Sequence, residues 1–225
     1  MFLKITDLAA ATGVDEKTVL DWIRHKGLPA HKQDDRYQIN RVDLLEWATN
    51  HNITIPPDIF VAGDENPDRP MVSEALLQGG IFFDLPGDTP EAALREVVSR
   101  LKLPPCLDPE FLLQTLLARE ALGSTAFGNG IAIPHVRNPI VGQTGESAIS
   151  LCFLRNPIDF DAIDGQPVTI LFTMVTPSVK AHLHLLAKLA FLLHDGGFQA
   201  LLHRPGSEAE IMKAVRLLEE TIIRR

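Results

Sequence analysis

The sequence predicts an α/β protein in which a mixed β-sheet is flanked by helices and preceded by a small helical domain with a two-stranded wing. From residue 72 onward, short apolar runs rich in β-branched residues alternate with longer segments of helical periodicity. The first 52 residues contain three helical segments, each preceded by a suitable capping residue. Residues 53–71 are rich in proline and acidic side chains. We therefore expect a domain over 1–52, a stiff linker over 53–71 and a larger domain over 72–225.

The composition is that of a globular protein. The chain has 225 residues, 45% of them apolar, and a net charge of −8, which favours one or two domains. Its two cysteines, Cys106 and Cys152, form neither a disulfide framework nor a metal-binding motif, as expected in a reducing compartment. No apolar stretch follows a basic start, and the most hydrophobic segment, 183–193, is too short to span a bilayer. We expect a cytoplasmic protein with no membrane insertion.

The helices of the first 52 residues are predicted from their caps. Thr6, Asp15 and Asn40 each precede a helical segment and can accept a hydrogen bond from its free N–H groups. The helices expected from these caps cover 7–12, 16–26 and 41–49. A polar turn at 33–36 lies between two flanking segments, which predicts a two-stranded wing over 31–39.

The larger domain is predicted to alternate strands and helices. Apolar, β-rich runs indicate a strand at 81–83 and central strands at 148–154 and 168–175, with an edge strand at 157–160. Capping residues and helical periodicity predict helices over 73–77, 90–101, 109–121, 179–193 and 198–203. Ser207 and Glu210 form a capping box for a last, amphipathic helix.

One stretch, 123–135, combines a Gly-Ser-Thr turn, a Gly-Asn-Gly loop and a short apolar run that leads into Pro134 and His135. Glycine at 128 and 130 removes Cβ atoms where the backbone must bend sharply or approach a ligand closely. A residue just beyond such a strand is held at the rim of the sheet, and proline stiffens it further. An isolated histidine in this place more often simply ends a strand.

Four segments of the sequence, taken together, bear on the role of His135. The segments 116–120 (LLARE), 123–125 (GST), 128–135 (GNGIAIPH) and 182–186 (HLHLL) occur in this order. Over 72–225 the chain resembles the IIA domain of the bacterial phosphoenolpyruvate-dependent phosphotransferase system, and most closely its nitrogen-regulatory branch of the fructose/mannitol type. The resemblance implies a IIA type-2 phosphotransferase/anion-transporter-like fold.

The resemblance also implies roles for named residues. By position, His135 is the histidine that is phosphorylated, Arg119 is the active-site arginine and His182 is the second active-site histidine. The turn and the loop supply the residues we assign to phosphate binding, namely Ser124, Thr125, Gly128, Asn129 and Gly130. The sequence departs from the family at Ala126-Phe127, which bears on the flexibility of the loop. It also departs at Val136-Arg137, so the docking surface is expected to select a different partner.

The chemistry of phosphoryl transfer fits these residue types. A neutral imidazole supplies the nucleophile, and an arginine supplies planar donors for phosphate oxygens. Backbone amides of the loop could form an anion-binding nest. No Gly-Lys-Ser/Thr follows the loop, so it is not a nucleotide loop, and neither a cofactor nor a metal is expected. For Arg119, the alternative is a surface ion pair with a neighbouring acid.

The two histidines of the HLHLL segment need separate interpretations. Positions 182 and 184 on a helix are about 200° apart, so their rings point to nearly opposite sides. The residues that share a helix face with position 182 are apolar and should face the sheet, whereas Lys188 shares the face of position 184. His182 is therefore placed at the packed edge. The same geometry argues against a zinc site made by this pair.

The first 52 residues contain short motifs at 5–9 (ITDLA), 13–15 (GVD), 18–24 (TVLDWIR), 27–30 (GLPA) and 36–39 (RYQI). These resemble the MerR/excisionase class of winged helix-turn-helix domains. The resemblance implies DNA binding, with the candidate contacts Lys17, Thr18, Arg24 and Arg36.

The charge of this region does not by itself favour DNA. Residues 1–55 hold seven Lys and Arg against eight Asp and Glu, a balance of −1, where a basic footprint is expected. Asp21 lies three residues before Arg24 and can partly cancel it. A homodimer would double a weak footprint. The alternative is that this fold serves as a protein-interaction module.

The sequence thus predicts a regulatory phosphocarrier of the phosphotransferase system rather than a free-standing turnover enzyme. His135 would accept a phosphoryl group from a histidine phosphocarrier protein, and its state would control a partner protein or transcription. The first alternative is a DNA-binding transcriptional regulator whose IIA-like domain is only a sensing or docking module. A third is a metal-dependent hydrolase that uses His135 with the pair at 182 and 184. We expect the polar linker to be unable to transmit strain between the domains.

Overall fold

The computed structural model describes residues 2–33, 36–51, 53–60, 70–103, 105, 107–136 and 145–223. The predictions that concern Cys106, Arg137 and the linker residues 61–69 lie outside this range. Cys152 is buried in the sheet, as expected for a structural cysteine, and burial raises the pKa of its thiol to about 12.

The N-terminal domain contains a three-stranded antiparallel sheet in the order β1-β3-β2 and three helices. Its elements are β1 (Phe2–Lys4), α1 (Ile5–Thr12), α2 (Glu16–His25), β2 (His31–Gln33), β3 (Arg36–Asn40) and α3 (Arg41–Asn50). The predicted wing is therefore present as β2 and β3. The sequence reading missed β1, which is only three residues long and is fixed by its pairing with β3.

Two of the three predicted caps of this domain are confirmed. The Asp15 carboxylate accepts from the Thr18 N–H at 2.7 Å, and the Asn40 side chain accepts from the Val42 N–H at 2.9 Å. The cap at Thr6 is wrong, because α1 already begins at Ile5. The Lys4 backbone N–H donates instead to the Asp7 carboxylate at 3.2 Å.

The larger domain is a mixed five-stranded sheet covered by helices, as predicted. Its elements are α4 (Val72–Gly79), β4 (Ile81–Leu85), α5 (Pro90–Arg100), α6 (Pro109–Glu120), β5 (Ala126–Gly128), β6 (Ile131–Ala132), β7 (Ala148–Ile158), β8 (Val168–Val175), α7 (Val179–Leu193), α8 (Gly196–His203) and α9 (Glu208–Ile223). The strand order is β4-β7-β8-β6-β5. β4 is parallel to β7, and β6 is parallel to β8, while β7 and β8 are antiparallel. The predicted separate edge strand at 157–160 is wrong, because Ile158 continues β7 and pairs with Val168 of β8.

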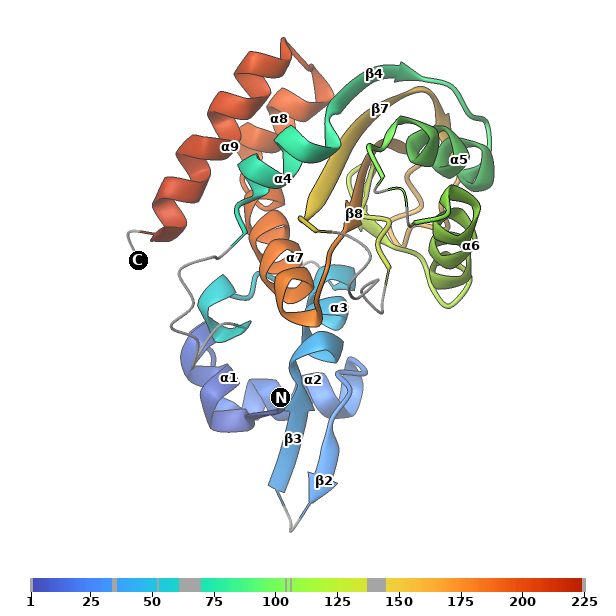
Figure 1. Ribbon diagram of the computed structural model, residues 1–225. Coiled ribbons are helices and arrows are strands. Elements are labelled where there is room, and N and C mark those ends of the chain that lie inside the picture. Colours follow the sequence, from blue (N-terminus) through green and yellow to red (C-terminus); the bar gives the residue numbers. More distant parts are fainter. Residues whose placement is uncertain are drawn as a thin grey trace.

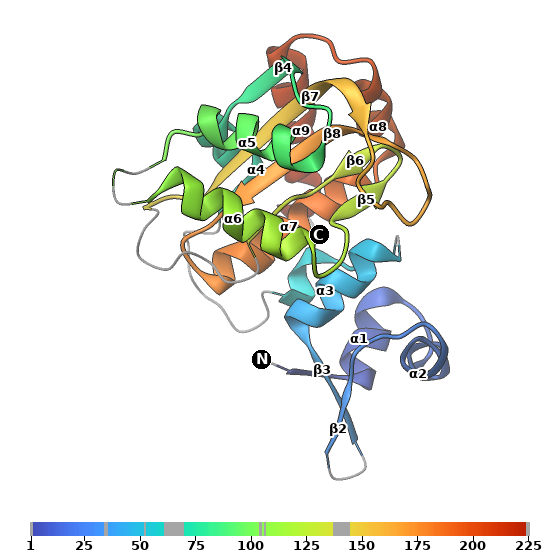
Figure 2. The same cartoon turned by 90° about the vertical axis from the view of Figure 1, so that its right-hand side faces the viewer.

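Helices cover both faces of the sheet (Figures 1 and 2), and the buried side chains form two apolar cores. On one face, α5 and α6 bury leucines such as Leu94 and Leu112. On the other face, α7 buries Leu185 and Leu189 against Phe172 of β8. Side chains alternate between the two cores along one strand, because successive residues of a strand point to opposite faces.

α7 is buried on more than the side that faces the sheet. His184 and Lys188 are both below 10% exposed, although they lie on the side of the helix that we expected to be polar. The Lys188 ammonium donates to the Pro70 carbonyl oxygen at 3.0 Å, and α4 and α9 contact the same helix. These neighbours come from distant parts of the chain, so the periodicity of α7 could not reveal them.

The segment that we predicted as a polar spacer is packed in its first part. A short 3-10 helix, η1 (Pro57–Phe60), lies against α7, and Ile55, Ile59 and Phe60 are buried there. Buried residues of α3, η1 and α7 belong to one continuous apolar cluster. The N-terminal domain is therefore held against the larger domain by apolar contact (Figure 1).

Glu219 of α9 should be a strong contributor to stability. It is 2% exposed, and its carboxylate accepts from the backbone N–H groups of Val72 and Ser73 at 2.5 and 3.2 Å. Glu219→Ala leaves these two donors at the start of α4 buried without their partner, which costs about 2–3 kcal/mol. Urea unfolding of Glu219→Ala and of the exposed control Glu220→Ala measures this difference. Equal destabilisation in the two variants would contradict the role of Glu219.

Candidate functional site

His135 lies just beyond β6, where that strand still follows β8. The parallel register that pairs Ile131 with Ile170 continues to His135 and Met174. The Met174 backbone N–H donates to the Pro134 carbonyl oxygen at 2.9 Å. Ile131 and Ile133 belong to the core on the α7 side of the sheet, and strand alternation sends His135 to the same side. The predicted delivery of this histidine by a short strand is confirmed, but its side chain is buried, at 5% exposed.

The hydrogen bond of His135 fixes its tautomer. Nδ1 lies 2.7 Å from the Ile133 carbonyl oxygen. A carbonyl oxygen can only accept, so Nδ1 carries the proton in this bond. In the neutral ring the lone pair then resides on Nε2, which is the nitrogen able to act as a nucleophile. The backbone two residues upstream thereby prepares the ring for attack through Nε2.

His182, from the first turn of α7, faces this ring. The centroids of the two imidazoles are 5.1 Å apart, with an angle of 44° between their planes. The Ser178 hydroxyl accepts from the Ala181 N–H and holds the start of the helix. Burial, and after it the positive charge of Arg119, lowers the pKa of His182 to about 4. The His182 ring is therefore neutral near pH 7.

Arg119 completes the group from the last turn of α6. Its side chain is 9% exposed, and Nη1 donates to the Gly123 carbonyl oxygen at 2.9 Å. Nη2 lies 3.9 Å from Oε2 of Glu46, which belongs to α3 of the N-terminal domain. An acid does therefore pair with Arg119, as in our alternative interpretation, but the pair is largely buried and joins two domains. Sequence reading missed Glu46, because no local pattern relates residue 46 to residue 119.

Two buried nitrogens of these residues have no hydrogen-bond partner in the described part of the chain, namely Nε2 of His182 and Nε of Arg119. A buried donor without a partner costs free energy, so such atoms in a folded protein need an explanation. The His182 ring lies beside that of His135, and the charge of Arg119 acts on His182. A tetrahedral oxyanion attached to Nε2 of His135 would offer acceptors to both.

The buried His182 ring should make folding stability depend on acid. Its folded-state pKa of about 4 lies below the ordinary 6.5, so the unfolded chain takes up the proton first. Above the unfolded pKa the ring is neutral in both states, and its contribution is fully present. As the pH falls toward 4, up to about 3 kcal/mol is lost. Urea unfolding at pH 7 and pH 4.5 should show a smaller loss in His182→Gln than in the wild type, and equal losses would contradict this assignment.

The glycine loop does not lie at His135, which corrects our assignment of Gly128, Asn129 and Gly130 to phosphate binding. The loop is the turn between antiparallel strands β5 and β6, at the start of β6, whereas His135 follows its end. His135 follows Gly130 by five residue steps, about 16 Å at the usual rise per residue of a strand. The Asn129 backbone N–H already donates to the Asp164 carboxylate at 2.7 Å. Positive φ angles at all three residues show that the loop is built as a tight turn.

Ser124 and Thr125 lie near the other end of the hairpin, but their hydroxyls are engaged. The Ser124 hydroxyl donates to the Phe160 carbonyl oxygen. The Thr125 hydroxyl and N–H both donate to the Glu120 carboxylate, at 2.6 and 2.8 Å. These bonds fix the turn that follows α6 and thus the position of Arg119. Both residues therefore support the site rather than offer donors to phosphate, which corrects their predicted role.

The predicted DNA contacts lie on α2 and on the wing of the N-terminal domain. Lys17, Arg24 and Arg36 are exposed, while Thr18 is half-buried and its N–H is taken by Asp15. Figure 2 shows α2 and the wing of β2 and β3 extending away from the sheet, with α3 between them and the larger domain. The acidic Asp21 is also exposed on α2, as the sequence suggested.

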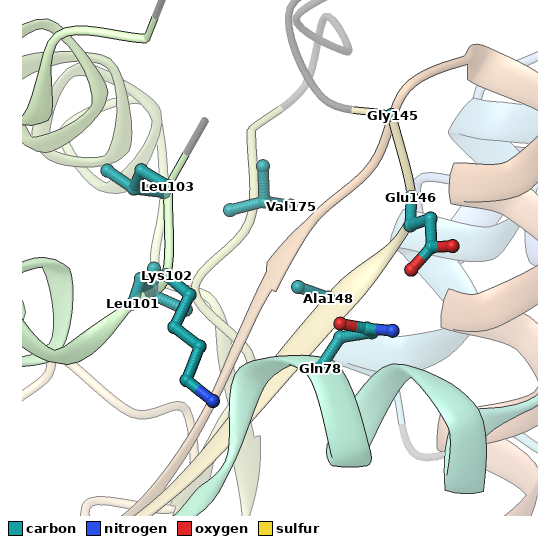
Figure 3. A pocket seen from close by; sticks show the side chains of 8 residues that line it. All are labelled: Gln78, Leu101, Lys102, Leu103, Gly145, Glu146, Ala148 and Val175. Atoms are coloured by element: carbon teal, nitrogen blue, oxygen red, sulfur yellow. The ribbon is translucent and has the colours of Figure 1, made fainter. Parts of the chain in front are cut away.

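A separate cavity of about 240 Å³ lies between the ends of β7 and β8 and the segment after α5 (Figure 3). Gln78, Lys102 and Glu146 contribute polar groups to its wall. Residues 119, 135 and 182 are not among those that line it.

Two properties of the described residues bear on the other hypotheses. They contain no group of three or more His, Cys, Asp or Glu side chains that could hold a metal ion. No single helix among them is both long and apolar enough to cross a membrane, although α7 and α8, bent by 84°, would pass as a pair by length and composition.

Comparison with known proteins gives two domain matches. Residues 75–217, more than half of the chain, match the family model described as phosphoenolpyruvate-dependent sugar phosphotransferase system, EIIA 2. Residues 2–52 match a helix-turn-helix domain. The two matches fall on the two structural parts that the linker region separates.

Individual relatives are similar to the larger part. A nitrogen regulatory protein of Pseudomonas aeruginosa is 38% identical over 126 residues, which cover 54% of this chain and 79% of the relative. A nitrogen regulatory protein of Escherichia coli K12 is 38% identical over 117 residues, 51% of this chain and 71% of the relative. Among solved structures, the nitrogen regulatory protein IIA-Ntr from Neisseria meningitidis is 29% identical with a TM-score of 0.58, over 64% of this chain and 98% of that chain.

Proposed function

Because the chain belongs to the EIIA 2 family of the phosphoenolpyruvate-dependent sugar phosphotransferase system, we propose that it is a regulatory phosphocarrier. Its His135 accepts a phosphoryl group from the phosphohistidine of a histidine phosphocarrier protein. The observation that carries this proposal is the buried pair of His135 and His182 rings, 5.1 Å apart, with Nδ1 of His135 held by the Ile133 carbonyl and with the charge of Arg119 acting on His182. Since its relatives are nitrogen regulatory proteins, the state of His135 would report on nitrogen supply to a protein target.

The transfer step follows from the tautomer. The Nε2 lone pair of His135 attacks the phosphorus of the donor, and a new N–P bond forms. The N–P bond of the donor breaks, and its electron pair returns to the donor imidazole. The proton on Nδ1 stays in place, and the Ile133 carbonyl stabilises the positive charge that the phosphorylated ring acquires.

The neighbouring residues stabilise the transferring group. Arg119 and neutral His182 supply donors to the equatorial oxygens, where charge is concentrated. Their burial strengthens these interactions and keeps water from hydrolysing the phosphohistidine. No metal ion is needed in this step, because the leaving group is an imidazole nitrogen rather than a polyphosphate oxygen.

A reconstitution tests the proposal. The full chain is incubated with labelled phosphoenolpyruvate and the general phosphocarrier proteins, and the modified residue is mapped by mass spectrometry. We expect one acid-labile, base-stable phosphoryl group on His135. Label on a residue other than His135 would overturn the proposal. The absence of label on both the wild-type chain and the Glu46→Arg variant, beside a fully labelled donor, would overturn it as well.

A second function is favoured by the helix-turn-helix match over 2–52 and by the exposure of Lys17, Arg24 and Arg36. In this proposal the N-terminal domain binds DNA through α2 and the wing, and the phosphorylation state acts on transcription. DNA binding by a single domain of balanced charge would be weak, so two copies on adjacent half-sites would strengthen it.

The DNA proposal makes its own prediction. Arg24→Ala and Arg36→Ala should each weaken binding to selected genomic fragments and lower the slope of log K against log salt by about 1, because each removes a phosphate contact. Fluorescence anisotropy between 50 and 200 mM salt measures both effects, with Lys213→Ala on α9 as the control. Absence of enriched fragments together with wild-type behaviour of both arginine variants would identify residues 2–52 as a protein-docking module.

A further inference from the structure

The N-terminal domain covers the acceptor site. α3 contacts both α7, which carries His182, and β5, which lies at the sheet edge beside β6 (Figures 1 and 2). His135, Arg119 and His182 are 5, 9 and 2% exposed. The site is thus assembled from the larger domain but closed by a helix of the smaller one.

The polar part of the contact is made by Glu46 of α3. Its Oε2 lies 3.9 Å from Nη2 of Arg119, and the two side chains are 15 and 9% exposed. A phosphoryl group on His135 is an anion that requires the same guanidinium. Placed beside Glu46 it would also face a negative charge at low solvent exposure, where repulsion is poorly screened.

The contact also has an apolar part. Buried residues of α3 and η1 form one cluster with α7, so closure removes apolar surface from water on both domains. This gives the closed form its own stabilisation, independent of the ion pair. The closed arrangement is consequently a defined state rather than a loose encounter.

A protein donor cannot reach a nucleophile enclosed in this way. The donor must bring its phosphohistidine into bonding distance of Nε2 of His135, which is buried. Stable protein contacts commonly bury about 800 Å² on each partner, so the donor needs an open surface around the site. The surface next to His182 and Arg119 is the one that α3 occupies.

We infer that docking of the N-terminal domain through α3 and phosphorylation of His135 are mutually exclusive, with Glu46 and Arg119 as the polar contact that holds the closed form. The donor phosphorylates the open form, and the phosphoryl group then takes the place of Glu46 on Arg119. The phosphorylation state is read out as the position of the N-terminal domain. This inference rests on the proposed phosphocarrier function and adds the device that regulates it.

The test opens the closed form in the full chain. Glu46→Arg sets two positive charges against each other at the contact, and Glu46→Gln removes the attraction. The matched control is Glu16→Arg, an exposed acid on α2 of the same domain, away from the site. We expect phosphorylation by the labelled donor to be faster in both Glu46 variants, by a factor within the 5- to 150-fold range of allosteric coupling, and unchanged in Glu16→Arg.

Amide hydrogen exchange separates opening from a local effect of charge. In unphosphorylated Glu46→Arg, and in the phosphorylated wild type, exchange should rise in α3 and in the first turns of α7 but not in α5. Equal phosphorylation rates in wild type and Glu46→Arg, with unchanged exchange in α3, would overturn the inference and leave the phosphocarrier function standing. Absence of label in every variant beside a labelled donor would overturn the function itself.

Discussion

His135→Asn is expected to abolish acid-labile phosphorylation of the chain while preserving most of its stability. The asparagine Nδ2 can replace Nδ1 of the imidazole as donor to the Ile133 carbonyl, so the backbone there keeps its partner. What is lost is the nucleophilic Nε2. Acid-labile label after incubation with the donor, measured on filters or by mass spectrometry, should fall to background.

The burial of His135 makes this choice of substitution matter. Since the side chain is 5% exposed, His135→Ala would leave a cavity and a carbonyl without its donor, which costs about 1–3 kcal/mol. His203→Asn, an exposed position on α8, is the matched control and should be phosphorylated like the wild type. Label retained in His135→Asn would place the acceptor elsewhere.

Removing either supporting donor should slow the transfer by a factor of about 10²–10³, the loss seen when one donor to a transition-state oxyanion is deleted. Arg119→Lys keeps the charge but loses the planar fork and the bond from Nη1 to the Gly123 carbonyl. His182→Ala removes a buried ring 5.1 Å from His135. Rapid-quench measurement of the first-order transfer rate at saturating donor gives both values.

Two comparisons distinguish a chemical role from a structural one. His182→Gln retains an amide donor near the position of Nε2 and should recover part of the rate lost in His182→Ala. Donor affinity, measured with an unphosphorylated donor in the Glu46→Arg background, should stay within a few-fold of the parent. Transfer rates that follow only the melting temperatures of the variants would reduce Arg119 and His182 to structural residues.

Local signals in the sequence account for most of the fold. Asp15, Asn40 and Ser207 cap helices as predicted, because a cap depends on N–H groups only two or three positions away. The central strands 148–154 and 168–175 were visible as β-rich apolar runs and lie within β7 and β8. The sequence did not predict β1 or the burial of the His184 side of α7, because both depend on contacts with residues distant in the chain.

The residues of the candidate site were likewise predicted only in part. Resemblance named His135, Arg119 and His182; the structure places the rings of His135 and His182 side by side, and the charge of Arg119 acts on His182. The glycine loop was assigned by proximity in sequence, yet an antiparallel hairpin carries its turn away from the ends of its strands, so Gly130 and His135 part. Glu46 could not be found at all, because its partner lies in another domain and no pattern in either segment encodes the meeting.

The apolar cluster that runs from α3 through η1 into α7 also determines where the chain can be cut. By sequence, the domain boundary lies in the proline-rich segment 53–71, but the core extends into the first part of that segment through Ile55, Ile59 and Phe60. A fragment starting at Val72 would expose the part of α7 that α3 and η1 now cover, and a fragment ending at residue 52 would expose the matching face of α3. Exposed apolar faces of this kind favour aggregation. The two domains are thus held together by the apolar surfaces that they share and not only by the peptide that connects them. A soluble fragment of the larger domain is best made by replacing apolar residues on the newly exposed face of α7 rather than by choosing a different first residue.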